Sequence, residues 1–206
     1  AFGLTLLEGY GLSETSPVAS FNHPDRPTKP GSVGTPIRGV EFGLRDDDDN
    51  EVADGEIGEI VIRGENVMKS YWNQSEATAD AMRGGWFHSG DLARRDEDGY
   101  YFIVDRKKDM INRGGYNVYP REVEEILYAH PAIAEAAVFG VPDAMYGEEV
   151  AALVTLKEGA SATEVELRNH VKEQIAAYKY PRIIRFGPIP KGPTGKILKR
   201  EIKFEP

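Results

Sequence analysis

The chain has 206 residues, 40% of them hydrophobic and 29% charged, and a formal net charge of −9 at pH 7. These values are typical of a folded globular protein, and the negative charge argues against a general nucleic-acid surface, which needs clustered lysine and arginine. The sequence contains no cysteine, which excludes disulfides and thiolate sites, and its scattered histidines predict no structural metal. Since neither a membrane-spanning run nor a signal peptide is recognisable, we expect a cytoplasmic protein.

The first half of the chain is predicted to be rich in β-structure. Residues 1–30 indicate a strand and a turn followed by a proline-rich loop. Apolar runs bounded by turn residues predict short strands at 40–45, 59–63 and 100–105. A short helix is expected at 75–82, and Trp86 begins a further extended segment. The acidic run at 46–49 lies between two predicted strands and is interpreted as a solvated hairpin tip without function.

After Asp105 the pattern becomes a mixture of α and β elements. A helix is predicted at 120–130, with Pro120 in its first turn and an apolar face formed by Val123, Ile126 and Leu127. Strands follow at 134–141 and 150–156. Ser161 and Glu164 have capping-box spacing before a helix with Leu167, Val171 and Ile175 on one face, and a last strand is predicted at 183–186.

The predicted fold is therefore α+β, with two lobes that meet near Lys107 and Lys108. We expect residues 1–107 to form one part, made of a motif-bearing segment at 1–30 and a β-rich subdomain at 31–107. Residues 108–206 are expected to form a separate lobe that folds independently, because it carries its own helix faces and strands.

Two motifs in the first lobe offer groups that suit a nucleotide. The segment from Gly9 to Thr15 combines glycines, the aromatic Tyr10, the hydroxyl of Ser13 and the carboxylate of Glu14. Together these groups suit adenine, phosphate and Mg²⁺. A glycine-rich turn with a packed aromatic side chain explains the same residues equally well. Further on, an aromatic strand ends in Gly90-Asp91, where one carboxylate can accept hydrogen bonds from both ribose hydroxyls. A plain turn is the simpler explanation of Asp91.

Two further motifs are rich in cations. Residues 105–109 contain Arg106, Lys107 and Lys108, which suit a nucleotide or form a solvated charge run. Residues 190–196 present Lys196 on a loop of glycine and proline that lacks the spacing of a Walker loop. A lysine on such a loop can neutralise charge that develops on a carboxylate and an α-phosphate as pyrophosphate leaves.

In order and spacing these motifs resemble those of the adenylate-forming superfamily, which comprises acyl-CoA synthetases, peptide-synthetase adenylation domains and beetle luciferases. The matching segments are Tyr10 to Glu14, Gly58 to Gly64, Ser89 to Leu92, Asp105 to Gly115 and Pro193 to Lys196. The stretch from Asp109 to Glu124 looks most like that of fatty acyl-CoA ligases. The resemblance implies an acid–thiol ligase that uses ATP and Mg²⁺, activates a carboxylic acid as an acyl-adenylate and transfers it to coenzyme A.

The resemblance also implies a role for each matching residue. Tyr10 would pack against adenine, and Gly11 would belong to the nucleotide-binding residues. Ser13 would contact the adenylate phosphate and Glu14 would hold the Mg²⁺ ion, both as catalytic residues, with serine standing where the family usually has threonine. Asp91 and Arg106 would hold the ribose hydroxyls. Lys108 would be the hinge about which the second lobe turns between two catalytic poses. Lys196 would serve adenylation as the catalytic lysine, and Gly114 and Gly115 would line the tunnel for the coenzyme A thiol.

The family's N-terminal phosphate-binding loop and most of its acyl pocket do not occur in this sequence. We therefore expect an incomplete part of an enzyme, inactive alone, whose main partner is the missing N-terminal part and which self-associates through exposed apolar surface. Two alternatives stay open, a non-catalytic binding module and a peptide-synthetase-type adenylation domain. Acyl chain length cannot be predicted from these residues.

Overall fold

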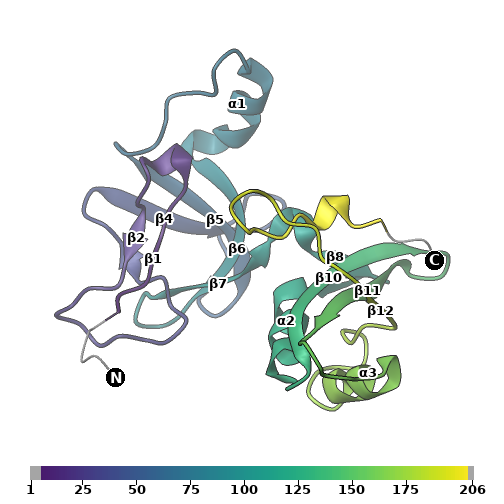
Figure 1. Ribbon diagram of the computed structural model, residues 1–206. Helices are drawn as coiled ribbons and strands as arrows, with labels where there is room; N and C mark the ends of the chain where they lie inside the picture. The colour runs from purple at the N-terminus through teal and green to yellow at the C-terminus, as the bar shows by residue number, and fades with distance from the viewer. Residues whose placement is uncertain (1–5, 204–206) are drawn as a thin grey trace. The chain divides into compact units, whose positions relative to one another are not determined.

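The structure is a computed structural model that describes residues 6–203 (Figure 1). The chain divides into two compact units, Ala1–Lys107 and Lys108–Pro206, and each is described by itself. Both units combine strands with short helices, so the predicted α+β fold is confirmed. Among the described residues, no helix has the length and apolar character needed to cross a membrane.

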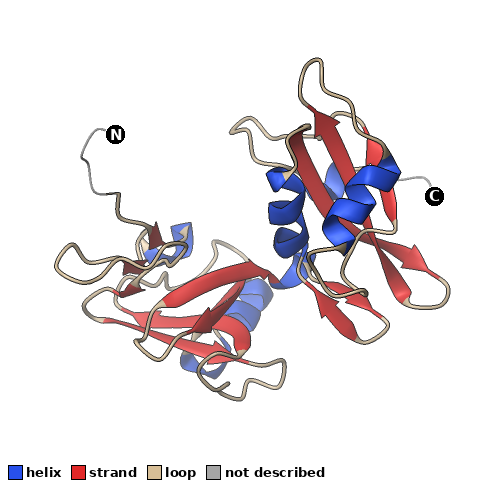
Figure 2. Ribbon diagram, turned by 90° about the horizontal axis from the view of Figure 1, so that it is seen from below, coloured by secondary structure: helices blue, strands red, loops and turns tan. Residues whose placement is uncertain are grey.

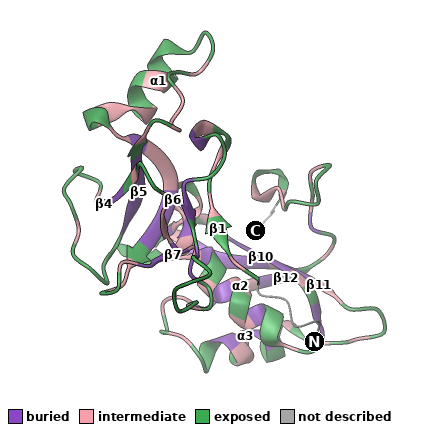
Figure 3. Cartoon of the chain, turned by 90° about the vertical axis from the view of Figure 1, so that its left-hand side faces the viewer, coloured by how far each residue is buried: buried purple, intermediate pink, exposed green. Residues whose placement is uncertain are grey.

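An antiparallel sheet of four strands forms the body of the first unit. Its strands follow one another in chain order: β4 (Val40–Arg45), β5 (Ile57–Gly64), β6 (Phe87–Arg95) and β7 (Tyr101–Arg106). The predicted strands at 40–45, 59–63 and 100–105 are confirmed within a residue or two at each end. Buried side chains concentrate on these strands, with Ile60 and Ile62 of β5 fully buried (Figure 3). Apolar burial of this kind is the main source of stability for the unit.

A smaller sheet carries the first sequence motif. It consists of β1 (Gly9–Tyr10), β2 (Ser20–Phe21) and β3 (Thr35–Pro36), paired antiparallel in that order. The second strand lies in the segment predicted as a loop and the third in the β-rich segment before its first predicted strand, because strands of two residues give no periodic signal. A short 3₁₀ turn, η1 (Ser13–Thr15), lies between β1 and β2.

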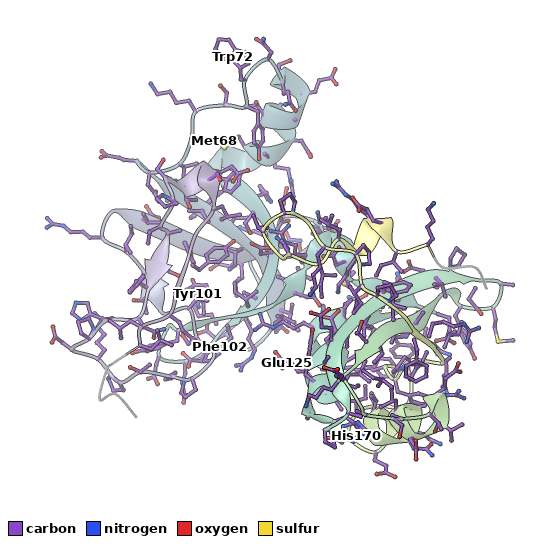
Figure 4. All side chains as sticks on the ribbon, viewed as in Figure 1. Met68, Trp72, Tyr101, Phe102, Glu125 and His170 are labelled. Atoms are coloured by element: carbon purple, nitrogen blue, oxygen red, sulfur yellow. The ribbon has the colours of Figure 1, made fainter. Side chains whose placement is uncertain are left out.

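A loop and a short helix connect β5 to β6. The helix α1 (Ser75–Ala81) confirms the helix predicted at 75–82, and the 3₁₀ turn η2 (Arg83–Gly85) follows it. The side chain of Trp72, in the loop before α1, is 88% exposed and points away from the sheet (Figure 4).

The second unit is built on a five-stranded sheet with two helices packed against it. The antiparallel order is β10-β11-β8-β9, and β12 pairs with β11 in parallel. The elements are the 3₁₀ turn η3 (Lys107–Asp109), which begins at the last residue of the first unit, then β8 (Ile111–Arg113), β9 (Tyr116–Val118), α2 (Pro120–Ala129), β10 (Ile133–Asp143), β11 (Gly147–Leu156), α3 (Glu164–Lys172), β12 (Ile183–Phe186) and the 3₁₀ turn η4 (Lys199–Glu201). Figure 2 shows both helices lying against the strands of this unit.

The core of the second unit follows the predicted helix faces. Val123 and Leu127 of α2 and Leu167 and Val171 of α3 are fully buried in one cluster, in which α2 packs on β10 and α3 packs on α2 and β12. Ile126 is partly buried at the edge of the same cluster. The predicted helix at 120–130 and the strands at 134–141, 150–156 and 183–186 are confirmed.

Three details of the prediction are wrong. Thr163, and not Ser161, caps α3: its hydroxyl accepts a hydrogen bond from the Glu166 amide while the Glu166 carboxylate accepts one from the Thr163 amide. The helix ends at Lys172, so Ile175 packs on the core from outside it. The strand that begins near Trp86 does not end at Gly90-Asp91 but runs through a bulge to Arg95, because glycine adopts the positive φ of 72° that the bulge requires.

Candidate functional site

Three of the predicted site residues come together in the first unit. The Tyr10 hydroxyl donates a hydrogen bond of 2.6 Å to Oδ2 of Asp91, and Nε of Arg106 lies 3.3 Å from Oδ1 of the same carboxylate. Asp91 and Arg106 are direct partners across β6 and β7, while Tyr10 reaches them from β1. The Tyr10–Asp91–Arg106 cluster therefore joins two consecutive strands to a residue that lies 81 positions before Asp91.

The Asp91 carboxylate of this cluster is buried beside a neutral donor. Asp91 is 6% exposed, whereas Arg106 keeps a large part of its side chain in solvent. Burial, and then the neighbouring Asp91 carboxylate, raise the pKa of the Tyr10 hydroxyl, which therefore stays a neutral donor. Each carboxylate oxygen has two lone pairs, so Asp91 retains capacity to accept further hydrogen bonds from a ligand hydroxyl.

The sequence did not predict the hydrogen bond from Tyr10 to Asp91. The tyrosine was assigned to adenine on the family resemblance, but in the structure its hydroxyl orients the carboxylate and its ring meets Phe42 edge-on at 6.2 Å. A separation of 81 residues leaves no local signal for this contact.

Ser13 and Glu14 lie on η1, beside the cluster in sequence. The Glu14 carboxylate accepts a hydrogen bond of 2.9 Å from the Tyr71 hydroxyl, and the Glu14 carbonyl accepts one from the Met68 amide. Ser13 is exposed and Glu14 is half-buried. Within residues 6–203 no group of three or more acidic, histidine or cysteine side chains is arranged to hold a metal. A single carboxylate nevertheless fits Mg²⁺, which is commonly held by one or two carboxylates together with substrate phosphates.

A close backbone contact explains why residue 11 of this motif is a glycine. A Cβ at Gly11 would lie 1.7 Å from the carbonyl oxygen of Pro17. Only glycine allows the chain to pass this close. The backbone contact with Pro17 therefore explains this glycine without any ligand.

Gly114 and Gly115 form the two-residue turn of the β8–β9 hairpin. Both have positive φ, 60° and 87°, the combination that a type I′ turn requires. The Gly115 amide donates to the Asn112 side chain, and the Gly114 amide to the Tyr146 carbonyl. The hairpin alone thus accounts for both glycines, and the predicted coenzyme A tunnel stays a prediction.

Lys196 lies on the returning arm of a small loop in the second unit, directly after the turn that the Gly195 amide closes by donating to the Gly192 carbonyl. Lys191 and Ile197 form an isolated β-bridge, and the Gly192 amide donates to the Lys196 carbonyl. Ion pairs fix both flanks, Lys191 with Glu135 and Lys199 with Glu124. The Lys196 side chain is exposed, and its ammonium group pairs with no residue between 6 and 203. Lys108 is also exposed, and the division between the two units falls directly before it.

Comparison with known proteins identifies the class. Residues 1–72 match the AMP-binding enzyme family, and residues 122–196 match the AMP-binding enzyme C-terminal domain. The chain belongs to the family of AMP-binding enzymes, and its predicted resemblance to the acyl-CoA synthetases of that family is confirmed.

Individual relatives show which enzymes of the family this chain resembles. The chain is 48% identical over 205 residues to a long-chain-fatty-acid–CoA ligase of Bacillus subtilis and 43% identical over 203 residues to a feruloyl-CoA synthase of an Amycolatopsis species. These alignments cover 98% of this chain but only 37% and 41% of the two relatives. Among solved structures, the o-succinylbenzoate CoA synthetase of Bacillus subtilis in complex with its acyl-adenylate matches with a TM-score of 0.91 and 34% identity, over 99% of this chain and 42% of that one.

Proposed function

We propose that this chain contributes the nucleotide-ribose site and the catalytic lysine of an ATP-dependent acid–CoA ligase. The observation that carries the proposal is the Tyr10–Asp91–Arg106 cluster, in which a buried carboxylate is held between a neutral hydroxyl and a guanidinium. Such a carboxylate is suited to accept hydrogen bonds from a vicinal diol like that of ribose. The chain spans 37% of the length of its Bacillus relative, so the complete reaction is proposed for a protein that also supplies the remaining region.

The proposed reaction consists of two displacements. A carboxylate oxygen attacks the α-phosphate of ATP and expels pyrophosphate, and the coenzyme A thiol then attacks the acyl carbon and expels AMP. The chain supplies no nucleophile for either step, so its contribution is orientation and charge stabilisation. Lys196 would neutralise charge in the first step, and its exposed position on an anchored loop supports that role.

The remaining assignments belong to the same proposal. Ser13 would contact the phosphate and Glu14 would contribute one carboxylate to Mg²⁺, which neutralises phosphate charge when bound. Tyr10 would pack against the adenine, and Gly11 would belong to the nucleotide-binding residues. Lys108 would act as a hinge and Gly114–Gly115 as the passage for the thiol.

We propose a fatty acid as the substrate, because the Bacillus relative is named as a long-chain-fatty-acid–CoA ligase. The feruloyl-CoA synthase similarity makes an aromatic acid the second candidate.

A chimera tests the proposal. The aligned region of the Bacillus ligase is replaced by this chain, and ATP–pyrophosphate exchange is measured with a long-chain fatty acid, because the Bacillus region supplies most of the acyl pocket. We expect exchange that is lost in Lys196→Ala and Asp91→Ala and retained in Glu41→Gln, a matched change of an exposed residue on β4. Equal exchange in all variants would refute the assigned roles, and a folded chimera without exchange would favour a non-catalytic module.

A further inference from the structure

A second polar cluster lies on the same sheet, outside the predicted site. At its centre is Glu59 of β5, which is 4% exposed. Its Oε1 accepts a hydrogen bond of 3.0 Å from the Gly90 amide. Its Oε2 lies 3.2 Å from Nζ of Lys107, 3.4 Å from Nδ1 of His88 and 3.5 Å from the Arg83 guanidinium. The two oxygens of one buried carboxylate thus have separate partners.

The acidic run at 46–49 takes part in this cluster. Asp47 pairs with Lys107 at 2.8 Å, and Asp49 pairs with Arg83 at 3.0 Å and lies 3.8 Å from His88. Both residues are exposed between β4 and β5, as the interpretation of a solvated tip expects, and they form these ion pairs in addition. The outer carboxylates balance cations that the single charge of Glu59 could not neutralise alone.

The Gly90 amide links the Glu59 cluster to the candidate nucleotide site. Residues 89–91 form the bulge of β6 opposite Ile60, where the register with β5 shifts. The Ser89 hydroxyl donates to the Ile60 carbonyl and accepts from the Asp91 amide. Glu59 holds the Gly90 amide, so the backbone that aims the Asp91 side chain is fixed by hydrogen bonds at Gly90 and at Asp91.

We propose that Glu59 is a positioning residue that fixes the β6 bulge and thereby orients the Asp91 carboxylate toward a bound ribose. Lys107, Arg83 and His88 keep the Glu59 carboxylate ionised and immobile. The inference deepens the proposed function, since its effect on binding rests on the role assigned to Asp91. The bulge itself can be tested without any ligand.

Charge balance explains why a carboxylate serves here and an amide would not. Burial alone would raise the pKa of Glu59, but the hydrogen bonds from Lys107 and the Gly90 amide outweigh it and hold the pKa below its ordinary value. A glutamine could still accept from Gly90, but its NH₂ group would then face the donors of Lys107 and Arg83. Glu59→Gln therefore changes the electrostatics at nearly constant volume.

The first experiment follows the Gly90 amide by NMR in the 206-residue chain. We expect its proton resonance to shift as the pH falls through the pKa of Glu59, with a midpoint below 4.5. The shift should be absent in Glu59→Gln, and Lys107→Met should raise the midpoint. A Gly90 resonance that titrates identically in wild type and Glu59→Gln would overturn the proposal.

The second experiment measures binding of AMP and of 2′,3′-dideoxy-AMP to the same chain. We expect Glu59→Gln to reduce the preference for AMP by about fivefold, in line with the loss of one well-formed hydrogen bond, and to add little to Asp91→Asn. Glu41→Gln, in the same sheet, should preserve the preference. A preference unchanged in Glu59→Gln but lost in Asp91→Asn would overturn the positioning role. Equal binding of both nucleotides by the wild type would instead refute the ribose role of Asp91, and the amide titration alone would then decide whether Glu59 fixes the bulge.

Discussion

Replacing Arg113 by methionine should destabilise the second unit strongly. Its guanidinium forms a two-pronged ion pair with Glu149, with distances of 2.5 and 2.7 Å, and both residues are 8% exposed. It also lies 4.0 Å from the Tyr146 ring centre. Removing one partner of such a pair leaves a buried charge, at a cost of about 3–5 kcal/mol.

The pair holds the β8–β9 hairpin to the rest of the sheet, because β8 and β11 share only the register pair Gly147 and Arg113. The loss of unfolding free energy is measured by urea denaturation, monitored through hydrogen exchange of the β8 and β11 amides. Replacing both members, in Arg113→Met with Glu149→Leu, should restore most of the loss. Glu125→Gln, which breaks an exposed pair on α2 (Figure 4), should cost under about 0.5 kcal/mol. A loss below about 1 kcal/mol in Arg113→Met would refute the reasoning.

Three further changes have expected outcomes. Thr163→Ala removes the cap of α3 and should cost about 1 kcal/mol in denaturant titration, and an unchanged midpoint would contradict the capping role. Gly115→Ala meets no atom within 4 Å but must adopt φ of 87°, so thermal unfolding should show a loss of about 1 kcal/mol or more from backbone strain alone. The folded-state pKa of Glu59 is depressed below 4.5, so Glu59 stabilises the fold above that pH and loses this contribution as the pH falls through the folded pKa. The free energy of unfolding of Glu59→Gln should therefore depend less on pH in the acid range. Wild-type and Glu59→Gln stabilities that fall in parallel with pH would contradict this role.

Sequence patterns predicted the longer elements of the fold because these elements bury one face. The 3.6-residue spacing of Val123 and Leu127 marks the buried side of α2, and the β-branched run of β5 marks a central strand. The β8–β9 hairpin was missed since strands of three residues carry no period. Its one local signal was the Gly114-Gly115 pair, which was assigned to a ligand.

The candidate site was predictable only as separate groups. The residue types of Tyr10, Asp91 and Arg106 suggested a nucleotide, but tertiary packing alone brings the first of them to the other two. The Glu59 cluster shows the same limit, because each of its charges looks solvated in the sequence. Charge pairing across strands depends on register, and a bulge such as that at Gly90 alters register without a distinctive sequence signal.

Binding of AMP to the 206-residue chain tests the nucleotide site most directly. NMR titration should place the largest changes on Tyr10, Asp91 and Arg106. Asp91→Asn should weaken binding about tenfold or more, the loss expected for a hydrogen bond to a charged group, while Glu41→Gln leaves it unchanged. Binding that is equally strong in Asp91→Asn, or changes confined to other residues, would contradict the assignment of this cluster to the ribose.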